Sequence, residues 1–216
     1  MKYLVSTGVS LSLLAMPGVA TAAGGGETRL GIGYGFGSVT LDDDFGNELS
    51  ADVTSTDLHF THFTGESGAV IGGFYGKTTL DEFELNGQAL NLGSADADIL
   101  GVRAGYRGGR YGTAQPVVLF LAQRVDPDEG DSNTALGVQV GMERTGQSSR
   151  FGLNGSFLND DDGHTLSFGA NVTLFATEQF GFSLGAGYAF GETEIFGEKL
   201  DTEEYGIRAG VELRFR

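Results

Sequence analysis

YGIRAGVELRF, residues 205–215, separates two kinds of side chain with a period of two. The apolar set is Tyr205, Ile207, Ala209, Val211, Leu213 and Phe215, and the residues between them are Gly206, Arg208, Gly210, Glu212 and Arg214. Because successive side chains of a β-strand point to opposite sides, the segment has one wholly apolar face. A tilted strand of about 9–11 residues crosses a bilayer. The segment therefore predicts a strand with one face toward lipid and the other toward a polar interior.

The same alternation recurs along the chain. It is clearest in residues 28–37, 166–174 and 180–190, and it is also present in 100–106, 136–142 and 151–157. Residues 52–64, 68–80 and 115–125 are less regular, and the last two segments carry apolar residues at both parities, so their faces stay unassigned. These segments predict ten strands, with eight as the alternative if the irregular ones are misread.

Composition agrees with extended structure. The chain has 37 Gly, 3 Pro and no Cys, and its mean hydropathy is only −0.07. Within hydrocarbon an unpaired backbone group is costly, so strands can cross a membrane only when their sheet closes. We therefore expect an all-β fold, a closed antiparallel transmembrane β-barrel. A soluble β-sandwich or lipocalin-like barrel is disfavoured by aromatic residues at the strand ends and by the glycine-rich opposite faces.

The N-terminus has the features of a secretory signal peptide. Lys2 precedes a short apolar stretch, residues 11–20, and Ala20-Thr21-Ala22 is the small-x-small pattern after which a signal peptidase cuts. We expect residues 1–22 to be removed and residues 23–216 to form the barrel. The apolar stretch is shorter than the roughly 20 residues that a spanning helix needs.

The end of the chain resembles a known family. Residues 208–215, RAGVELRF, are similar to the C-terminal assembly signal of the small outer-membrane barrels of Gram-negative bacteria, which include the OmpA N-terminal domain, OmpX, Ail and the opacity proteins. The resemblance implies contact with outer-membrane lipid and lipopolysaccharide, a monomer, and recognition of Gly210, Leu213 and Phe215 by the barrel-assembly machinery. Here Arg216 follows the aromatic residue at which the family usually ends.

Charge predicts how the barrel lies in the bacterial outer membrane. An even strand number puts both termini on one side, taken as periplasmic, and such barrels have long outer loops and short inner turns. The predicted outer loops are 42–51, 81–96, 126–132, 159–163 and 191–202, and the inner turns are near 65–67, 108–114, 145–149 and 177–178. Acidic residues concentrate in the outer set. The net charge of −16 argues against a nucleic-acid partner.

The acidic outer loops are candidate Ca²⁺ or Mg²⁺ sites, because these ions prefer several oxygen ligands. The residues concerned are Asp42, Asp43, Asp44, Asp126, Asp128, Asp131, Asp160, Asp161 and Asp162. No loop has EF-hand spacing, and Asp is also a common turn residue. Apart from such loop-bound ions, we expect no cofactor.

Titratable residues on the predicted inner faces form a second candidate site. They are Arg103, Arg208, Glu212, Arg214 and Glu143, with Asp57 as a less regular member. Charges held away from water must be paired or hydrated. In a ten-stranded barrel, which is nearer in width to a filled eight-stranded barrel than to a porin, these residues predict a charge-plugged lumen. A conducting pore is the alternative.

Catalytic sets are incomplete. His164 and Ser167 are three residues apart and so fall on opposite faces of a regular strand, which excludes the pairing that barrel lipid hydrolases use. Asp57 and His59 share a face, but nothing else completes a protease site, and His59 and His62 are interpreted as wall or interface residues. We therefore expect a non-enzymatic barrel with a structural or surface-interaction role. A small porin is the second hypothesis and a barrel hydrolase the third.

Overall fold

The computed structural model describes residues 26–128, 130–195 and 198–215, so the predicted signal peptide lies outside the described residues. The strands are β1 (Glu27–Asp42), β2 (Glu48–Phe63), β3 (Gly68–Leu85), β4 (Gln88–Ala89), β5 (Ala95–Arg107), β6 (Ala114–Pro127), β7 (Asn133–Thr145), β8 (Ser149–Asn159), β9 (Gly163–Phe175), β10 (Phe180–Ile195) and β11 (Glu198–Phe215). The two-residue β4 belongs to a connection, and the ten long strands confirm the predicted number. In the described part of the chain, no helix is long and apolar enough to span a membrane.

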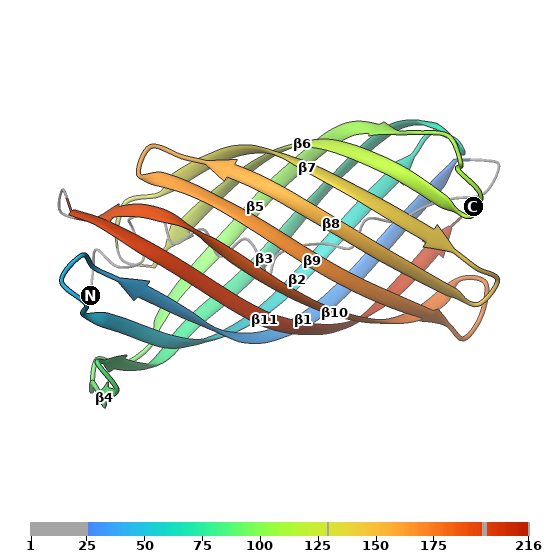
Figure 1. Ribbon diagram of the computed structural model, residues 1–216. Coiled ribbons are helices and arrows are strands. Elements are labelled where there is room, and N and C mark those ends of the chain that lie inside the picture. The colour runs from blue at the N-terminus through green and yellow to red at the C-terminus, as the bar shows by residue number, and fades with distance from the viewer. Residues whose placement is uncertain (1–25, 129, 196–197, 216) are drawn as a thin grey trace.

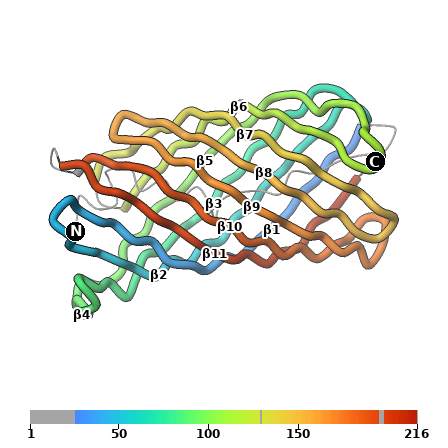
Figure 2. The backbone as a smooth tube through the Cα atoms, viewed as in Figure 1, coloured from blue at the N-terminus to red at the C-terminus, as the bar shows by residue number. Residues whose placement is uncertain are grey.

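The ten long strands close into a barrel (Figure 1). Each pairs antiparallel with its neighbour in sequence, β2 pairs with β3, and β1 pairs with β11 from Thr28↔Phe215 to Asp42↔Asp201. The tube view shows the same unbroken wall (Figure 2). We call the end where β1 begins and β11 ends the terminal rim, and the opposite end the distal rim. The predicted closed antiparallel barrel is confirmed.

The two faces of the wall follow the predicted period of two. Outward apolar side chains such as Ile32, Leu184 and Tyr205 are more than half exposed, whereas inward residues of the same strands are largely covered. The faces of β3 and β6 can now be assigned. Val70 on β3, and Val117 and Leu119 on β6, point inward and pack together with Phe63. Apolar residues occur at both parities there because the interior itself has an apolar cluster.

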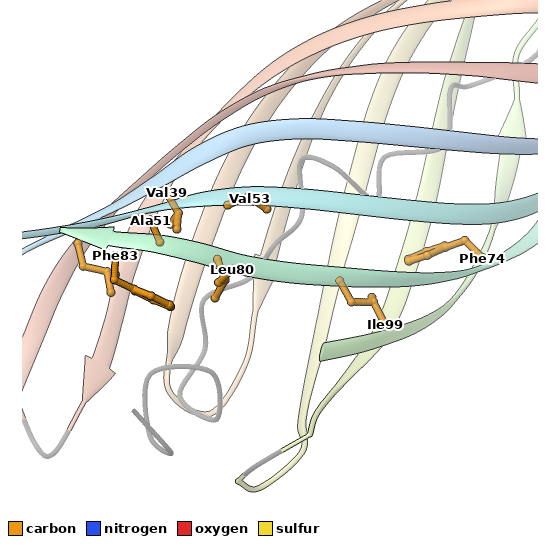
Figure 3. Close-up of a cluster of buried hydrophobic side chains, with 8 residues drawn as sticks. Val39, Ala51, Val53, Phe74, Leu80, Phe83 and Ile99 are labelled. Atoms are coloured by element: carbon orange, nitrogen blue, oxygen red, sulfur yellow. The ribbon is translucent and has the colours of Figure 1, made fainter. Parts of the chain in front are cut away.

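A second inner apolar cluster lies nearer the distal rim (Figure 3). Its buried members are Val39, Leu41, Ala51, Val53, Phe74, Leu80, Phe83 and Ile99. The ladder between β2 and β3 shifts register between Ser50 and Asp52, and Glu82 on the facing strand has a positive φ of 50°. This bulge keeps both Leu80 and Phe83 on the inner face although they are three residues apart.

The strands run further toward the distal rim than the sequence predicts. The predicted outer loop 191–202 is mostly a hairpin in which Glu192 pairs with Asp201 and Ile195 with Glu198. The predicted loop 81–96 shortens to 86–94, because β3 continues to Leu85. Apart from 86–94, the distal connections are about as short as the terminal turns, so the predicted difference in loop length is wrong.

Candidate functional site

Glycines on the inner face make room for large polar side chains. A Cβ at Gly31 would collide with the His59 ring, and one at Gly33 would collide with the Arg208 guanidinium. These contacts explain why the glycine face of β1 lies beside charged residues of β2 and β11. The alternation in the sequence therefore determines two things, which face of a strand meets lipid and where large side chains fit inside the barrel.

The first interior cluster joins β2 to β11. Arg208 donates two hydrogen bonds to the Asp57 carboxylate, Nε to Oδ1 and Nη2 to Oδ2, each at 2.6 Å. His59 Nδ1 lies 2.9 Å from Asp57 Oδ2 and 3.3 Å from Arg208 Nη2. Arg103 of β5 is also buried and donates to the hydroxyl of Thr61. A planar guanidinium that meets a carboxylate at two points fixes both side chains.

The second cluster lies closer to the terminal rim and crosses the interior. Arg150 of β8 donates to both oxygens of Glu212 on β11, at 2.7 and 2.6 Å, although these strands are not neighbours. Arg150 Nε is also 3.4 Å from Glu143 Oε1. Arg29 pairs with Glu27 and lies 3.9 Å from Glu143 and 4.0 Å from Glu212. Positive and negative groups thus alternate across the barrel.

Two turns of the terminal rim are held by interior side chains. Arg214 donates to the backbone carbonyl of Glu178, at 3.0 and 2.7 Å, and its guanidinium lies 4.2 Å from the centre of the Phe175 ring. Arg107 donates to the carbonyl of Gly65, and Gln115 donates to the carbonyl of Glu66 at 2.9 Å. These bonds hold the β9–β10 and β2–β3 turns to side chains that are themselves buried inside the barrel.

The structure groups only part of the predicted set. It joins Asp57 to Arg208, it places Glu143 and Glu212 around a shared arginine, and it shows Arg214 donating to the turn carbonyl of Glu178. Sequence reasoning missed four residues at these sites, Glu27, Arg29, Arg107 and Arg150. The two-residue alternation was the available signal, because each of these residues lies at an inward-facing position of its strand.

A small cavity lies beside the two charged clusters. A cavity of about 40 Å³ is lined by His59, Arg150, Arg208 and Glu212 together with small or amide residues of β8–β11. A water molecule needs roughly 10–15 Å³ of such volume, so this cavity holds only a few.

The catalytic candidates stay apart. His164 is exposed and points outward, whereas Ser167 is buried and bonds to Ser156, 2.6 Å away. His62 is on the outer face at the terminal rim, where its Nδ1 lies 2.9 Å from the Thr28 hydroxyl. His59 is occupied by the Asp57–Arg208 cluster.

Two acidic residues of the distal rim, Asp43 and Asp160, stabilise their own turns. Asp43 accepts hydrogen bonds from the backbone of Phe45 and Asn47 and from the Asn47 side chain, and the Asn47 side chain is the main cause of its lowered pKa. Asp160 caps the β8–β9 turn, and partial burial is the main cause of the raised pKa of Asp162. Within residues 26–215, leaving aside 129, 196 and 197, no three acidic or histidine side chains are placed to hold a metal ion.

The predicted assembly signal is on the wall. Leu213 and Phe215 point outward, and Gly210 lies inside between Gly33 and Ser183.

The fold has counterparts among solved structures. The outer-membrane protease OmpT of Escherichia coli superposes with a TM-score of 0.57 over 91% of this chain and 99% of its own, at 7% identity. The chain has the outer-membrane β-barrel fold. An outer-membrane channel of Pseudomonas putida F1 matches at TM-score 0.48 and 12% identity over 91% and 97% of the two chains, and Ail of Yersinia pestis at 0.39 and 17% over 88% and 99%. Comparison with family models and with curated proteins gives no match.

Such low identities concern the outer-membrane β-barrel fold alone. Folds of this kind host unrelated activities, so function has to come from the interior and the rims of this chain.

Proposed function

We propose that the protein is a closed, monomeric barrel of the bacterial outer membrane, with periplasmic termini and a structural or surface-interaction role. The outward faces of its strands suit contact with outer-membrane lipid and lipopolysaccharide. The terminal rim would face the periplasm, where the barrel-assembly machinery would read Gly210, Leu213 and Phe215. No cofactor is needed for this role.

The observation that carries the proposal is the ion-pair cluster that crosses the barrel. Arg150 and Glu212 come from strands that are not neighbours, and a bond that spans part of the interior supports a closed barrel over an open channel. The turns held by Arg107 and Arg214 support closure at the terminal end. Charges held away from water are costly unless they are paired, so the ion pairs are consistent with a poorly hydrated interior.

Single-channel recording in planar bilayers tests this proposal. The closed barrel is expected to give no steady conductance. A steady conductance that is abolished by a bulky residue, as in Gly185→Phe or Gly210→Phe, would establish a pore and overturn the closed interior. Gly109→Phe is the matched control, because a Cβ at Gly109 meets nothing within 4 Å.

A further inference from the structure

The most prominent feature outside the barrel wall is at the distal rim. The tip of the β1–β2 hairpin, residues 43–48, lies beside residues 82–94, which contain the end of β3, the short β4 and the connection to β5. We call these two segments together the distal ridge. Figure 1 shows the part around β4 projecting away from the neighbouring strands at this rim.

The two segments of the distal ridge are hydrogen-bonded to each other in the free protein. Asn86 and Glu48 exchange two hydrogen bonds, from Glu48 N to the Asn86 side chain at 2.9 Å and from Asn86 N to the Glu48 carbonyl at 2.8 Å. Leu90 donates its amide to Phe83 at 2.7 Å and packs against the inner apolar cluster. A surface that is already ordered loses little conformational entropy on binding.

Large apolar side chains are exposed on this ridge. Phe45 is 84% exposed, and Leu85 and Leu92 are 41% and 42% exposed. Phe45 lies at the hairpin tip and Leu85 pairs with Leu49 on the neighbouring strand. All three residues belong to the distal ridge, and several large exposed apolar side chains in one region are typical of an interaction site.

The same two segments of the chain are rich in acidic residues. Residues 42–48 and 81–94 contain Asp42, Asp43, Asp44, Glu48, Asp81, Glu82 and Glu84, and neither segment contains Lys or Arg. A second copy of this chain, with its net charge of −16, would meet the same charges and be repelled. Phosphate groups of lipids and nucleic acids would be repelled for the same reason. The complementary partner is basic and also has apolar side chains.

We propose that the distal ridge binds basic, amphipathic polypeptide segments, with Phe45 and Leu92 as apolar contacts and the carboxylates of the same segments attracting the positive charge. The inference rests on the proposed function in one respect, because the ridge meets such partners only if the distal rim is outside the cell.

The test uses the full barrel in nanodiscs of zwitterionic lipid and an 18-residue amphipathic peptide of leucine and lysine, with empty nanodiscs as the blank. The peptide is expected to bind barrel nanodiscs at least ten-fold more tightly than the blank. Phe45→Ser combined with Leu92→Ser should weaken binding about ten-fold, as loss of an aromatic contact at the centre of an interface does. Tyr111→Ser is the matched control, since Tyr111 is 79% exposed at the terminal rim.

Charge is tested separately. Asp44→Asn with Glu84→Gln should weaken binding and reduce its dependence on salt, and a leucine–glutamate peptide should not bind. Equal binding by the Phe45/Leu92 variant and the parent overturns the proposal. The proposal is also overturned if the ridge binds anionic vesicles, or a second barrel, and does not bind the lysine peptide. Conductance of the Phe45/Leu92 variant distinguishes failure of this proposal from failure of the proposed closed barrel. If the ridge does not bind the peptide, the barrel still gives no steady conductance. If the barrel is an open pore, peptide binding by the ridge is unchanged.

Discussion

At the scale of single residues, buried ion pairs hold together strands that the sheet does not join. Arg150 donates to Glu212 from three strands away around the wall, and Glu143 shares the same guanidinium. Removing one member of such a pair leaves an uncompensated charge in a poorly hydrated interior, which costs far more than losing a surface pair.

Arg150→Gln is therefore expected to lower the free energy of unfolding by about 3–5 kcal/mol, because Glu212 loses its two hydrogen bonds. Denaturant titration followed by circular dichroism measures the change. Arg124→Gln is the control, since Arg124 bonds the exposed Asp126 at 2.8 Å and should cost at most about 1 kcal/mol. Adding Glu212→Gln should recover part of the loss, and equal small effects of both single variants would contradict the assigned pairing.

The interior residues were only partly predictable from the sequence. The alternation of the strands put Arg103, Arg208 and Glu212 inside, and the same alternation could also have placed Arg29 and Arg150 there. Partner choice was not predictable, because it depends on which strands face each other across the closed barrel. Arg214 shows the difference, as it binds the carbonyl of Glu178.

At the scale of elements, the strand segments that face lipid were predictable, and the strand segments nearer the distal rim were less so. Residues 192–201 carry charge on both faces, so they have no apolar period, although the ladder between β10 and β11 continues through them. The inner and outer faces of β3 and β6 could not be told apart in the sequence, because their inner residues are also apolar. Hairpin tips depend on local hydrogen bonds, of which the Asp43 cap is the clearest case.

Asp43→Ala is expected to release the β1–β2 tip, with faster amide exchange at Phe45 and Asn47, and Asp44→Ala is the control. The cap needs the carboxylate, and the hydrogen bonds from Asn47 lower the pKa of Asp43 in the folded protein. The cap should thus be complete above the ordinary Asp value of about 3.9 and be lost as the pH falls through the lowered pKa. The Asn47 amide resonance, followed against pH, should have its midpoint below that value.

At the scale of the whole molecule, closure decides which residues have partners. β1 and β11 would be edge strands in an open sheet, yet they pair along their length. The closed wall leaves no free row of backbone groups, and a membrane barrel requires this because lipid offers no hydrogen bonds.

Closure predicts that successive amide protons of β11 from Asp201 to Leu213, where it pairs with both neighbours, are all protected from exchange, those directed at β1 as strongly as those directed at β10. In a sheet open between β1 and β11, every second amide of β11 would exchange rapidly. Hydrogen exchange read by nuclear magnetic resonance distinguishes the two, with the tip residues 44–46 as the rapidly exchanging reference.

The pairing of Thr28 with Phe215 also sets an order in time. The contact joins the first and the last long strand of the barrel, so it cannot form until the last strand has been made. Until then the growing sheet has two edge strands with unpaired backbone groups, and each of them can pair with another chain. A chain that stops short of residue 198 would keep those edges permanently, and its fate would be aggregation or degradation instead of insertion.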